Sequence, residues 1–220
     1  MPLKDLLLAL VVIVAWGLNF VVIKVGLDGL PPMLLGGLRF ALVAIPAVFF
    51  IRRPQLPWRW LIAYGATISL GQFAFLFQAM GNGMPPGLAS LVLQSQAFFT
   101  LFFAAIFLGE RLRAASVLGL LVAAGGLALI GSENGNHVPL LALALTLCGA
   151  ACWAMGNIIT RRFGNIDLVA LVIWGALIPP LPFFALSWYL EGPALIESSL
   201  RNIGMSSILS LVYLALIATM

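Results

Sequence analysis

The chain has 220 residues, of which 63% are hydrophobic and 8% are charged, and its formal net charge is +4. Its mean hydropathy is +1.14. A soluble domain of this size needs more polar surface than these residues can supply, so the composition excludes one.

Apolar segments of helix length follow one another along the chain. About 20 apolar residues are needed to cross the ~30 Å hydrocarbon core of a bilayer. Seven segments approach or reach that length, and an eighth begins near Met205, which predicts an all-α, polytopic membrane protein. The seven are Leu6–Val25, Met33–Ile51, Trp60–Met80, Gly87–Leu108, Ala114–Ile130, Leu140–Thr160 and Leu168–Leu190.

The basic residues are distributed unevenly between the loops on the two sides. If the N-terminus lies inside, the outer loops hold only Lys24 and Arg201. The inner side then holds Lys4, Arg52, Arg53, Arg59, Arg111, Arg113, Arg161 and Arg162. This positive-inside bias predicts a multi-pass membrane protein with a cytoplasmic N-terminus. It also accounts for the positive net charge without a nucleic-acid partner.

The second half of the chain repeats features of the first in the opposite orientation. Trp16 precedes Lys24 by eight residues, and Trp153 precedes Arg161 by eight. The next segment in each series carries a proline followed by a phenylalanine pair. These are Pro46 with Phe49 and Phe50, and Pro180 with Phe183 and Phe184. If one copy holds five spanning helices, the second copy enters the membrane from the other side, as in many secondary transporters.

We therefore predict a first repeat over residues 1–130 (helices 1–5) and an incomplete second repeat over residues 138–220 (helices 6–8). A complete inverted repeat would have ten helices, of which this chain covers about eight. We expect that this length is a fragment or a truncated form, and that it does not transport by itself.

Catalytic and metal-binding patterns are absent from the sequence. The single histidine, His137, falls in a loop, and the expected membrane segments contain neither Asp nor Glu. Acid–base pairs, nucleophilic triads and metal clusters need such groups close together. The sequence therefore predicts no enzyme activity, no catalytic residue, no metal site and no cofactor.

Arg39 is the charged residue placed inside an expected helix, about six residues from its outer end. An arginine inside the membrane is costly, so it should face water, a partner or a substrate. Its guanidinium can bind a carboxylate through two parallel hydrogen bonds. The alternatives are that the side chain extends to the outer interface or that it donates hydrogen bonds to carbonyls at a helix end.

Amides and tryptophans form the remaining candidates for substrate binding. Asn19 and Asn157 occupy similar places after Trp16 and Trp153, and each amide needs a partner in the membrane, either a substrate or another helix. The tryptophans either line a cavity or pack. Gln72 is expected on the pathway, on one face with Ser69. Gln94 and Gln96 are about 200° apart on a regular helix. One of them therefore faces the pathway and the other a neighbouring helix, and the spacing leaves open which. Gln94 is the candidate taken here.

Several short motifs resemble those of the EamA family in the drug/metabolite transporter superfamily. They are Ala15–Phe20, Gly37–Phe40, Ala89–Gln94, Gly109–Arg111 and Trp153–Asn157. The first helix through Lys24, Gly71–Phe77 and Gln94–Phe99 look most like family members that export O-acetylserine and cysteine.

This resemblance covers the entire chain and implies ten helices in two inverted halves around a central cavity. It also implies a location in the bacterial inner membrane. There the protein would export amino acids or other small metabolites from the cytoplasm by alternating access. Arg39 would then hold a substrate carboxylate, while Asn19, Gln72 and Gln94 would supply neutral hydrogen bonds. Trp16 and Trp153 would shape the cavity. The expected partners are a small-molecule substrate and the lipid bilayer.

Other functions remain compatible with the sequence. A non-transporting membrane protein or partner subunit would also consist of apolar helices, and a drug exporter could belong to the same family. The sequence leaves open the exact substrate, the choice between proton coupling and facilitated export, and the oligomeric state.

Overall fold

The computed structural model describes residues 3–110, 114–134, 138–164 and 166–218. These residues form helices and turns, with no strand among them. By length and composition, five helical segments of this described part could each cross a membrane. They are Lys4–Leu27, Trp58–Gly81, Pro86–Leu108, Leu140–Phe163 and Leu168–Leu190. The predicted all-α, polytopic fold is confirmed. His137, Arg111 and Arg113 lie outside the described residues.

The first two helices lie close to their predicted positions. α1 spans Leu3–Leu27, and α2 spans Pro32–Ala47. α2 begins at a proline, whose missing N–H is not needed in a first helical turn. It ends four residues before the predicted end at Ile51. The turn that follows leaves Phe49 and Phe50 exposed.

The third segment contains a π-helix between two α-helices. α3 spans Trp58–Tyr64, η1 spans Gly65–Gly71, and α4 spans Gln72–Gly81. In η1 the backbone N–H of Gln72 donates to the carbonyl of Thr67, five residues earlier. A π-helix has wider turns than an α-helix and is often found at a functional site.

Two further segments are interrupted. The fourth consists of α5 (Pro86–Leu93) and α6 (Gln96–Leu108). Between them the N–H of Ser95 donates to the carbonyl of Val92, only three residues earlier, so the turn is tighter than an α-turn. The seventh consists of α9 (Leu168–Gly175) and α10 (Pro180–Leu190). Pro179 and Pro180, the first residue of α10, lack the N–H groups that would continue the hydrogen bonding of α9.

The remaining helices are α7 (Ala114–Asn134), α8 (Leu140–Phe163), α11 (Pro193–Arg201) and α12 (Met205–Leu216). α11 lies between the seventh predicted segment and the eighth, where no helix was predicted. Its axis makes an angle of 102° with α12.

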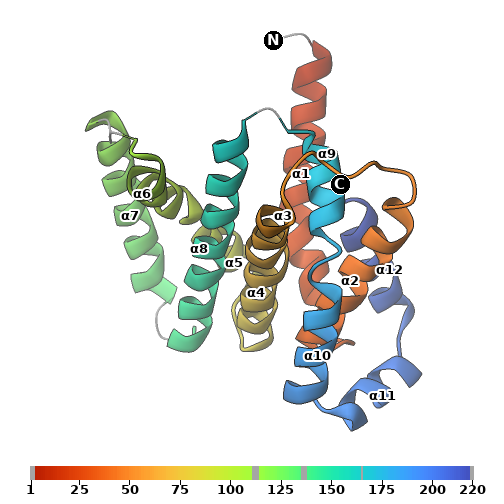
Figure 1. The fold of residues 1–220 in the computed structure, drawn as a ribbon. Coiled ribbons are helices and arrows are strands. Elements are labelled where there is room, and N and C mark those ends of the chain that lie inside the picture. The colour runs from red at the N-terminus through yellow and green to blue at the C-terminus, as the bar shows by residue number, and fades with distance from the viewer. Residues whose placement is uncertain (1–2, 111–113, 135–137, 165, 219–220) are drawn as a thin grey trace.

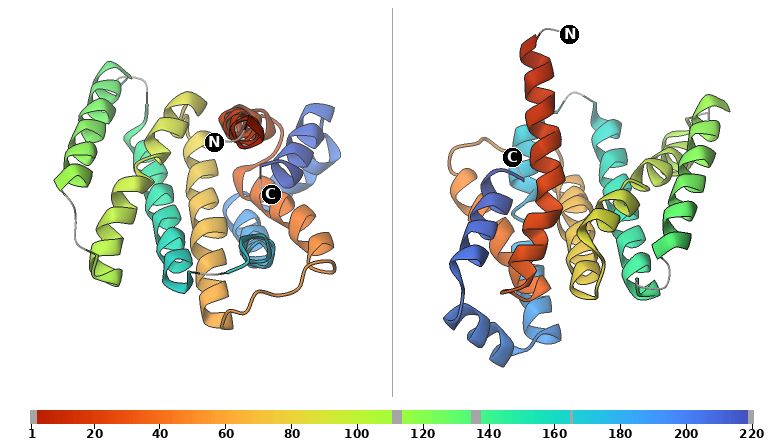
Figure 2. Two further views of the ribbon diagram at one scale, coloured as in Figure 1. Left: turned by 90° about the horizontal axis from the view of Figure 1, so that it is seen from above. Right: turned by 180° about the vertical axis from the view of Figure 1, so that it is seen from behind.

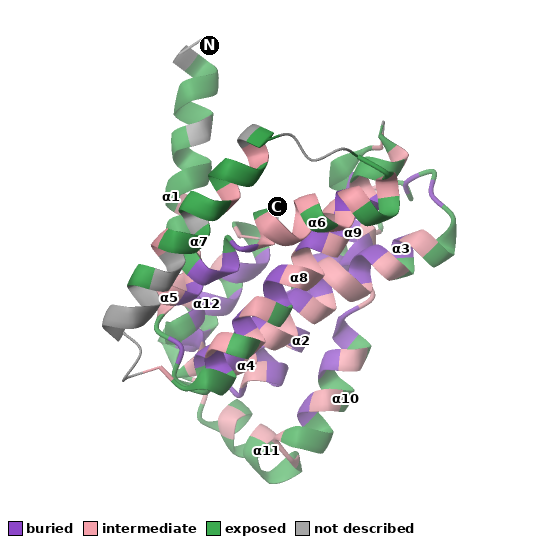
Figure 3. Ribbon diagram, turned by 90° about the vertical axis from the view of Figure 1, so that its left-hand side faces the viewer, coloured by how far each residue is buried: buried purple, intermediate pink, exposed green. Residues whose placement is uncertain are grey.

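The helices form a bundle with α7 at one edge (Figures 1 and 2). α8 packs between α4 and α6, α2 packs against α10, and α1 packs against α12. Buried residues concentrate in α2, α4, α8, α9 and α12, whereas α1 and α11 are mostly exposed (Figure 3). In a membrane, exposed apolar helix faces contact lipid.

Glycines allow α2 and α10 to approach closely. A Cβ built on Gly36 would lie 2.7 Å from the ring of Phe183, and one on Gly37 would lie 2.6 Å from the ring of Phe184. Small residues at such places let helices pack in lipid. The second phenylalanine pair therefore packs on α2, unlike the exposed first pair, so the two sequence-equivalent pairs have different environments.

Glu191 also links α2 to the end of α10. Its Oε1 accepts a hydrogen bond from the backbone N–H of Met33 at 2.6 Å, and its Oε2 accepts one from Leu34 at 3.2 Å. The hydroxyl of Ser187 donates to Oε2 at 2.6 Å. The first N–H groups of a helix have no partners within the helix, and a carboxylate is favoured there. Glu191 therefore caps α2 from the second half of the chain.

Candidate functional site

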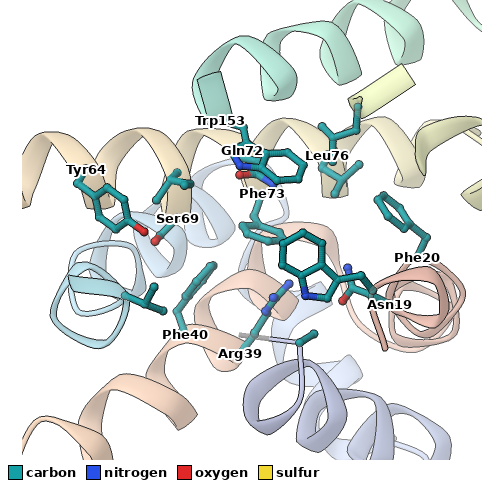
Figure 4. Close-up of a pocket in the computed structure, with 15 residues that line it drawn as sticks. Asn19, Phe20, Arg39, Phe40, Tyr64, Ser69, Gln72, Phe73, Leu76 and Trp153 are labelled. Atoms are coloured by element: carbon teal, nitrogen blue, oxygen red, sulfur yellow. The ribbon is translucent and has the colours of Figure 1, made fainter. Parts of the chain in front are cut away.

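A cavity of about 190 Å³ lies between α1, α2, α8 and the third segment (Figure 4). Arg39 is the one charged residue among the described residues that line it. The lining is otherwise aromatic and aliphatic, with a few neutral polar groups. The cavity is bordered by Trp16, Asn19, Phe20, Arg39, Phe40, Tyr64, Ile68, Ser69, Gln72, Phe73, Leu76, Leu93, Trp153, Val172 and Ala218.

Arg39 enters this cavity from α2 and is only 1% exposed. Its guanidinium carbon lies 4.1 Å from the ring centroid of Phe73 and 5.3 Å from that of Phe40. An aromatic ring attracts a cation over its face, most strongly away from water. These rings hold the guanidinium inside the bundle, and the alternative of extension to the outer interface does not occur in this structure.

The π-helix determines which residues of the third segment face the cavity. Tyr64 precedes η1 and Phe73 follows it, and both line the cavity. On a regular α-helix, residues nine positions apart would point in roughly opposite directions, since each turn takes 3.6 residues. The wider turns of η1 delay this rotation. The segment therefore presents Tyr64, Gln72 and Phe73 to one space.

α1 contributes residues from a single helical face. Trp16, Asn19 and Phe20 are three and four residues apart, which places them on neighbouring turns. The Oδ1 of Asn19 is buried and accepts no hydrogen bond from the described residues. A buried amide oxygen usually has a donor. Asn19 therefore offers an acceptor at the cavity wall.

Trp16 and Trp153 meet in the same wall, with their ring centroids 6.2 Å apart and an angle of 64° between their planes. Edge-to-face contacts of this kind are favourable. The structure thus brings together five predicted site residues at one cavity. They are Trp16, Asn19, Arg39, Gln72 and Trp153.

Two other predicted site residues lie elsewhere. Asn157 donates to the side-chain oxygen of Gln96 at 3.0 Å and to that of Thr100 at 3.3 Å, so its amide connects α8 to α6. Gln94 is exposed and does not line the cavity. Of the two glutamines, Gln96 faces the neighbouring helix.

The sequence analysis missed the aromatic side chains around Arg39, mainly Phe40, Tyr64 and Phe73. Two of them directly follow a polar residue that was identified: Phe40 follows Arg39, and Phe73 follows Gln72. In a chain with 15 phenylalanines, this proximity alone does not distinguish cavity residues from packing residues.

Residues 3–132 match the model of the EamA-like transporter family. The chain belongs to this family. Two longer relatives come from Escherichia coli (strain K12) and Salmonella typhimurium. Both are called a probable amino-acid metabolite efflux pump. Each is 52% identical over the whole chain, which spans 75% of that protein.

More distant EamA relatives and a solved structure agree. An uncharacterized transporter of Bacillus subtilis, YvbV, is 30% identical over 76% of this chain and 57% of its own length. A crystal structure of a protein 26% identical in sequence superimposes with a TM-score of 0.63, covering 95% of this chain and 72% of that one. The predicted class, a membrane transporter of the EamA family, is confirmed. Membership implies a small-molecule substrate and a membrane location.

Proposed function

We propose that the chain exports amino acids or closely related metabolites, such as cysteine and O-acetylserine, from the cytoplasm. The names of the relatives at 52% identity support amino-acid metabolites as the substrate class. The observation that carries the proposal is Arg39, a buried cation that faces a small, largely apolar cavity. A guanidinium binds a carboxylate through two parallel hydrogen bonds, and the attraction between the charges is stronger in a site shielded from water.

Three polar side chains would bind the two ends of an amino acid. Arg39 would hold the carboxylate, and the Oδ1 of Asn19 would accept a hydrogen bond from the ammonium group. Gln72, which is also buried, would supply a further hydrogen bond. Trp16 and Trp153 would form the apolar wall against the substrate side chain. Binding sites of this kind combine a mostly apolar surface with a few placed polar groups.

Export would proceed by alternating access between the two inverted repeats, residues 1–130 and 138–220. Two contacts join these parts at opposite ends of the bundle. Glu191 caps α2 at one end, and Arg161 pairs with Glu110 over 3.4 Å at the other. With a cytoplasmic N-terminus, the first would lie on the outer side and the second on the inner side. Opening toward either side would weaken the contact on that side.

Export of labelled cysteine and O-acetylserine from cells tests this function. Cells would produce this chain extended to the ten helices expected from the sequence, the Arg39→Gln variant of that form, or the E. coli relative as a reference. Arg201→Gln is a matched control, because Arg201 is an exposed arginine on α11. We expect export by the extended form and its Arg201→Gln control, and loss of export in Arg39→Gln.

Two results would contradict the proposal. If the reference exports these metabolites while the extended form is present in the membrane and does not, the proposed function is wrong. If Arg39→Gln exports as fast as Arg201→Gln, the carboxylate role of Arg39 is wrong.

A further inference from the structure

Besides Arg39 in the cavity, a group of arginines lies at one end of the bundle. It surrounds the start of α3, between the end of α8 and the start of α9. That end also holds the N-terminus and the connections α2–α3 and α8–α9 (Figure 1). The group, here called the arginine patch, consists of Arg53, Arg59 and Arg162 with the rings of Trp58 and Trp60. All three arginines are exposed.

Indole rings hold these arginines in place. The guanidinium of Arg53 lies 4.3 Å from the ring centroid of Trp58, and its Nη2 donates to the carbonyl of Leu56 at 2.9 Å. Trp58 in turn contacts Trp174 edge to face, and the Nε1 of Trp174 donates to the carbonyl of Ile51 at 2.9 Å. The loop before α3 is thereby fixed to α9, and Arg53 is fixed to the loop.

Arg59 and Arg162 approach one ring from two helices. Their guanidinium carbons lie 5.8 Å and 5.0 Å from the ring centroid of Trp60, which itself contacts Phe163 edge to face. Two like charges near one ring repel each other, and an anion bound between them would offset this repulsion. The arrangement would therefore be stabilised by a bound anion.

The described residues supply no such anion. Their ion pairs join Lys24 to Asp28, Arg161 to Glu110 and Arg201 to Glu197, and none includes an arginine of the patch. Asp167, the acidic residue at the start of α9, accepts hydrogen bonds from the N–H groups of Val169 and Ala170. The anion would therefore come from another molecule.

The position of the patch favours a lipid. The ends of membrane-crossing helices lie at the level of the headgroups, where tryptophans are also concentrated. Exposed apolar side chains continue from the patch along α3 and α9, namely Ile62, Leu168 and Val169. They could contact acyl chains below a bound headgroup. We propose that Arg53, Arg59 and Arg162, held on Trp58 and Trp60, bind the phosphate of an anionic phospholipid headgroup.

Native mass spectrometry of the full chain tests this proposal. The protein is purified in detergent and incubated with equal amounts of phosphatidylglycerol and phosphatidylethanolamine. We expect phosphatidylglycerol to be retained preferentially. A variant with Arg53→Gln, Arg59→Gln and Arg162→Gln should lose at least about tenfold in retention, since each arginine near an anionic surface contributes about fivefold in affinity. Arg161→Gln is the control on the same face, because Arg161 already pairs with Glu110, and it should retain the lipid.

Three results would overturn the proposal. The first is equal retention of the two lipids by the unchanged protein. The second is equal retention of phosphatidylglycerol by the triple variant and the control. The third is complete displacement of the lipid by millimolar inorganic phosphate, which would show a site for a free anion. If the triple variant does not fold, the three single variants carry the test, and retention equal to the control by all three would overturn it.

Discussion

Trp16 and Trp153 touch edge to face at the wall of the cavity, with ring centroids 6.2 Å apart. These residues occupy equivalent places in the two predicted repeats. Their contact therefore joins the repeats at the point where we propose that the substrate binds. Five of the seven predicted site residues line the cavity at this contact, the two tryptophans among them.

Changing Arg39 should impair export more than it impairs folding. Arg39→Gln should lower the export rate of zwitterionic substrates at least tenfold, because the carboxylate loses a charged partner. Arg39→Lys should keep part of the activity, since an ammonium keeps the charge but lacks the planar fork. The measurement is the initial export rate, divided by the amount of protein in the membrane. Similar rates for both variants and the wild type would contradict the binding role.

Phe73 should act through Arg39, because its ring lies under the guanidinium. Phe73→Leu removes a cation–π contact that contributes about 0.5–2 kcal/mol. We expect the apparent affinity for substrate to fall by roughly twofold to thirtyfold, which is that energy as a ratio, with little change in expression. Phe102→Leu, on an exposed face of α6, is the control. An equal effect of both changes would mean that Phe73 serves general packing.

Gly36 and Gly17 should respond differently to the same substitution. A Cβ on Gly36 would meet the buried ring of Phe183, whereas nothing lies within 4 Å of a Cβ on Gly17. Gly36→Ala should therefore destabilise the protein by about 1–3 kcal/mol, the usual cost of overpacking. Gly17→Ala should cause no loss of stability. Thermal unfolding in detergent measures both, and equal midpoints would contradict the close packing of α2 and α10.

Glu191 should stabilise the fold more than other acidic residues of its region. Glu191→Gln weakens charge-assisted hydrogen bonds to the first turn of α2, each of which contributes about 1.5–3 kcal/mol. We expect a fall of several degrees in the midpoint of thermal unfolding. Glu197→Gln breaks the exposed pair with Arg201, and exposed pairs contribute little. A midpoint for Glu191→Gln equal to that of Glu197→Gln would argue against the cap.

We expect Asn157 to stabilise helix packing rather than to bind substrate. It bonds Gln96 on α6, and hydrogen bonds between membrane helices contribute about 0.6 kcal/mol on average and at most about 1.7. Asn157→Ala should cost about this much stability and leave substrate specificity unchanged. A double-mutant cycle with Gln96→Leu would show coupling of that size. A changed substrate preference in Asn157→Ala would instead show that Asn157 contributes to substrate binding.

Helix positions were predictable because each segment had to be apolar over a membrane-length run. Even the interrupted third and seventh segments were predicted as single apolar stretches, because hydropathy does not register the hydrogen-bond pattern inside them. Arg39, Asn19 and Gln72 stood out for a related reason: polar groups in lipid are costly and therefore informative.

The aromatic part of the cavity could not be predicted in the same way. Whether Tyr64 and Phe73 line the same cavity depends on the wide turns of η1, and no single residue type identifies a π-helix. The bonding of Asn157 to Gln96, rather than to a substrate, depends on how α6 and α8 pack. Such contacts between distant segments follow from the three-dimensional arrangement, and one sequence does not reveal them.

The cap on α2 has a consequence for how the protein is made. Glu191 follows Met33 by 158 residues, and the N-terminal part of a chain emerges first during synthesis. The first turn of α2 must therefore bind water or headgroups until α10 has been made. The predicted first repeat cannot reach its final form alone, and the two halves mature together as one cooperative unit rather than one after the other.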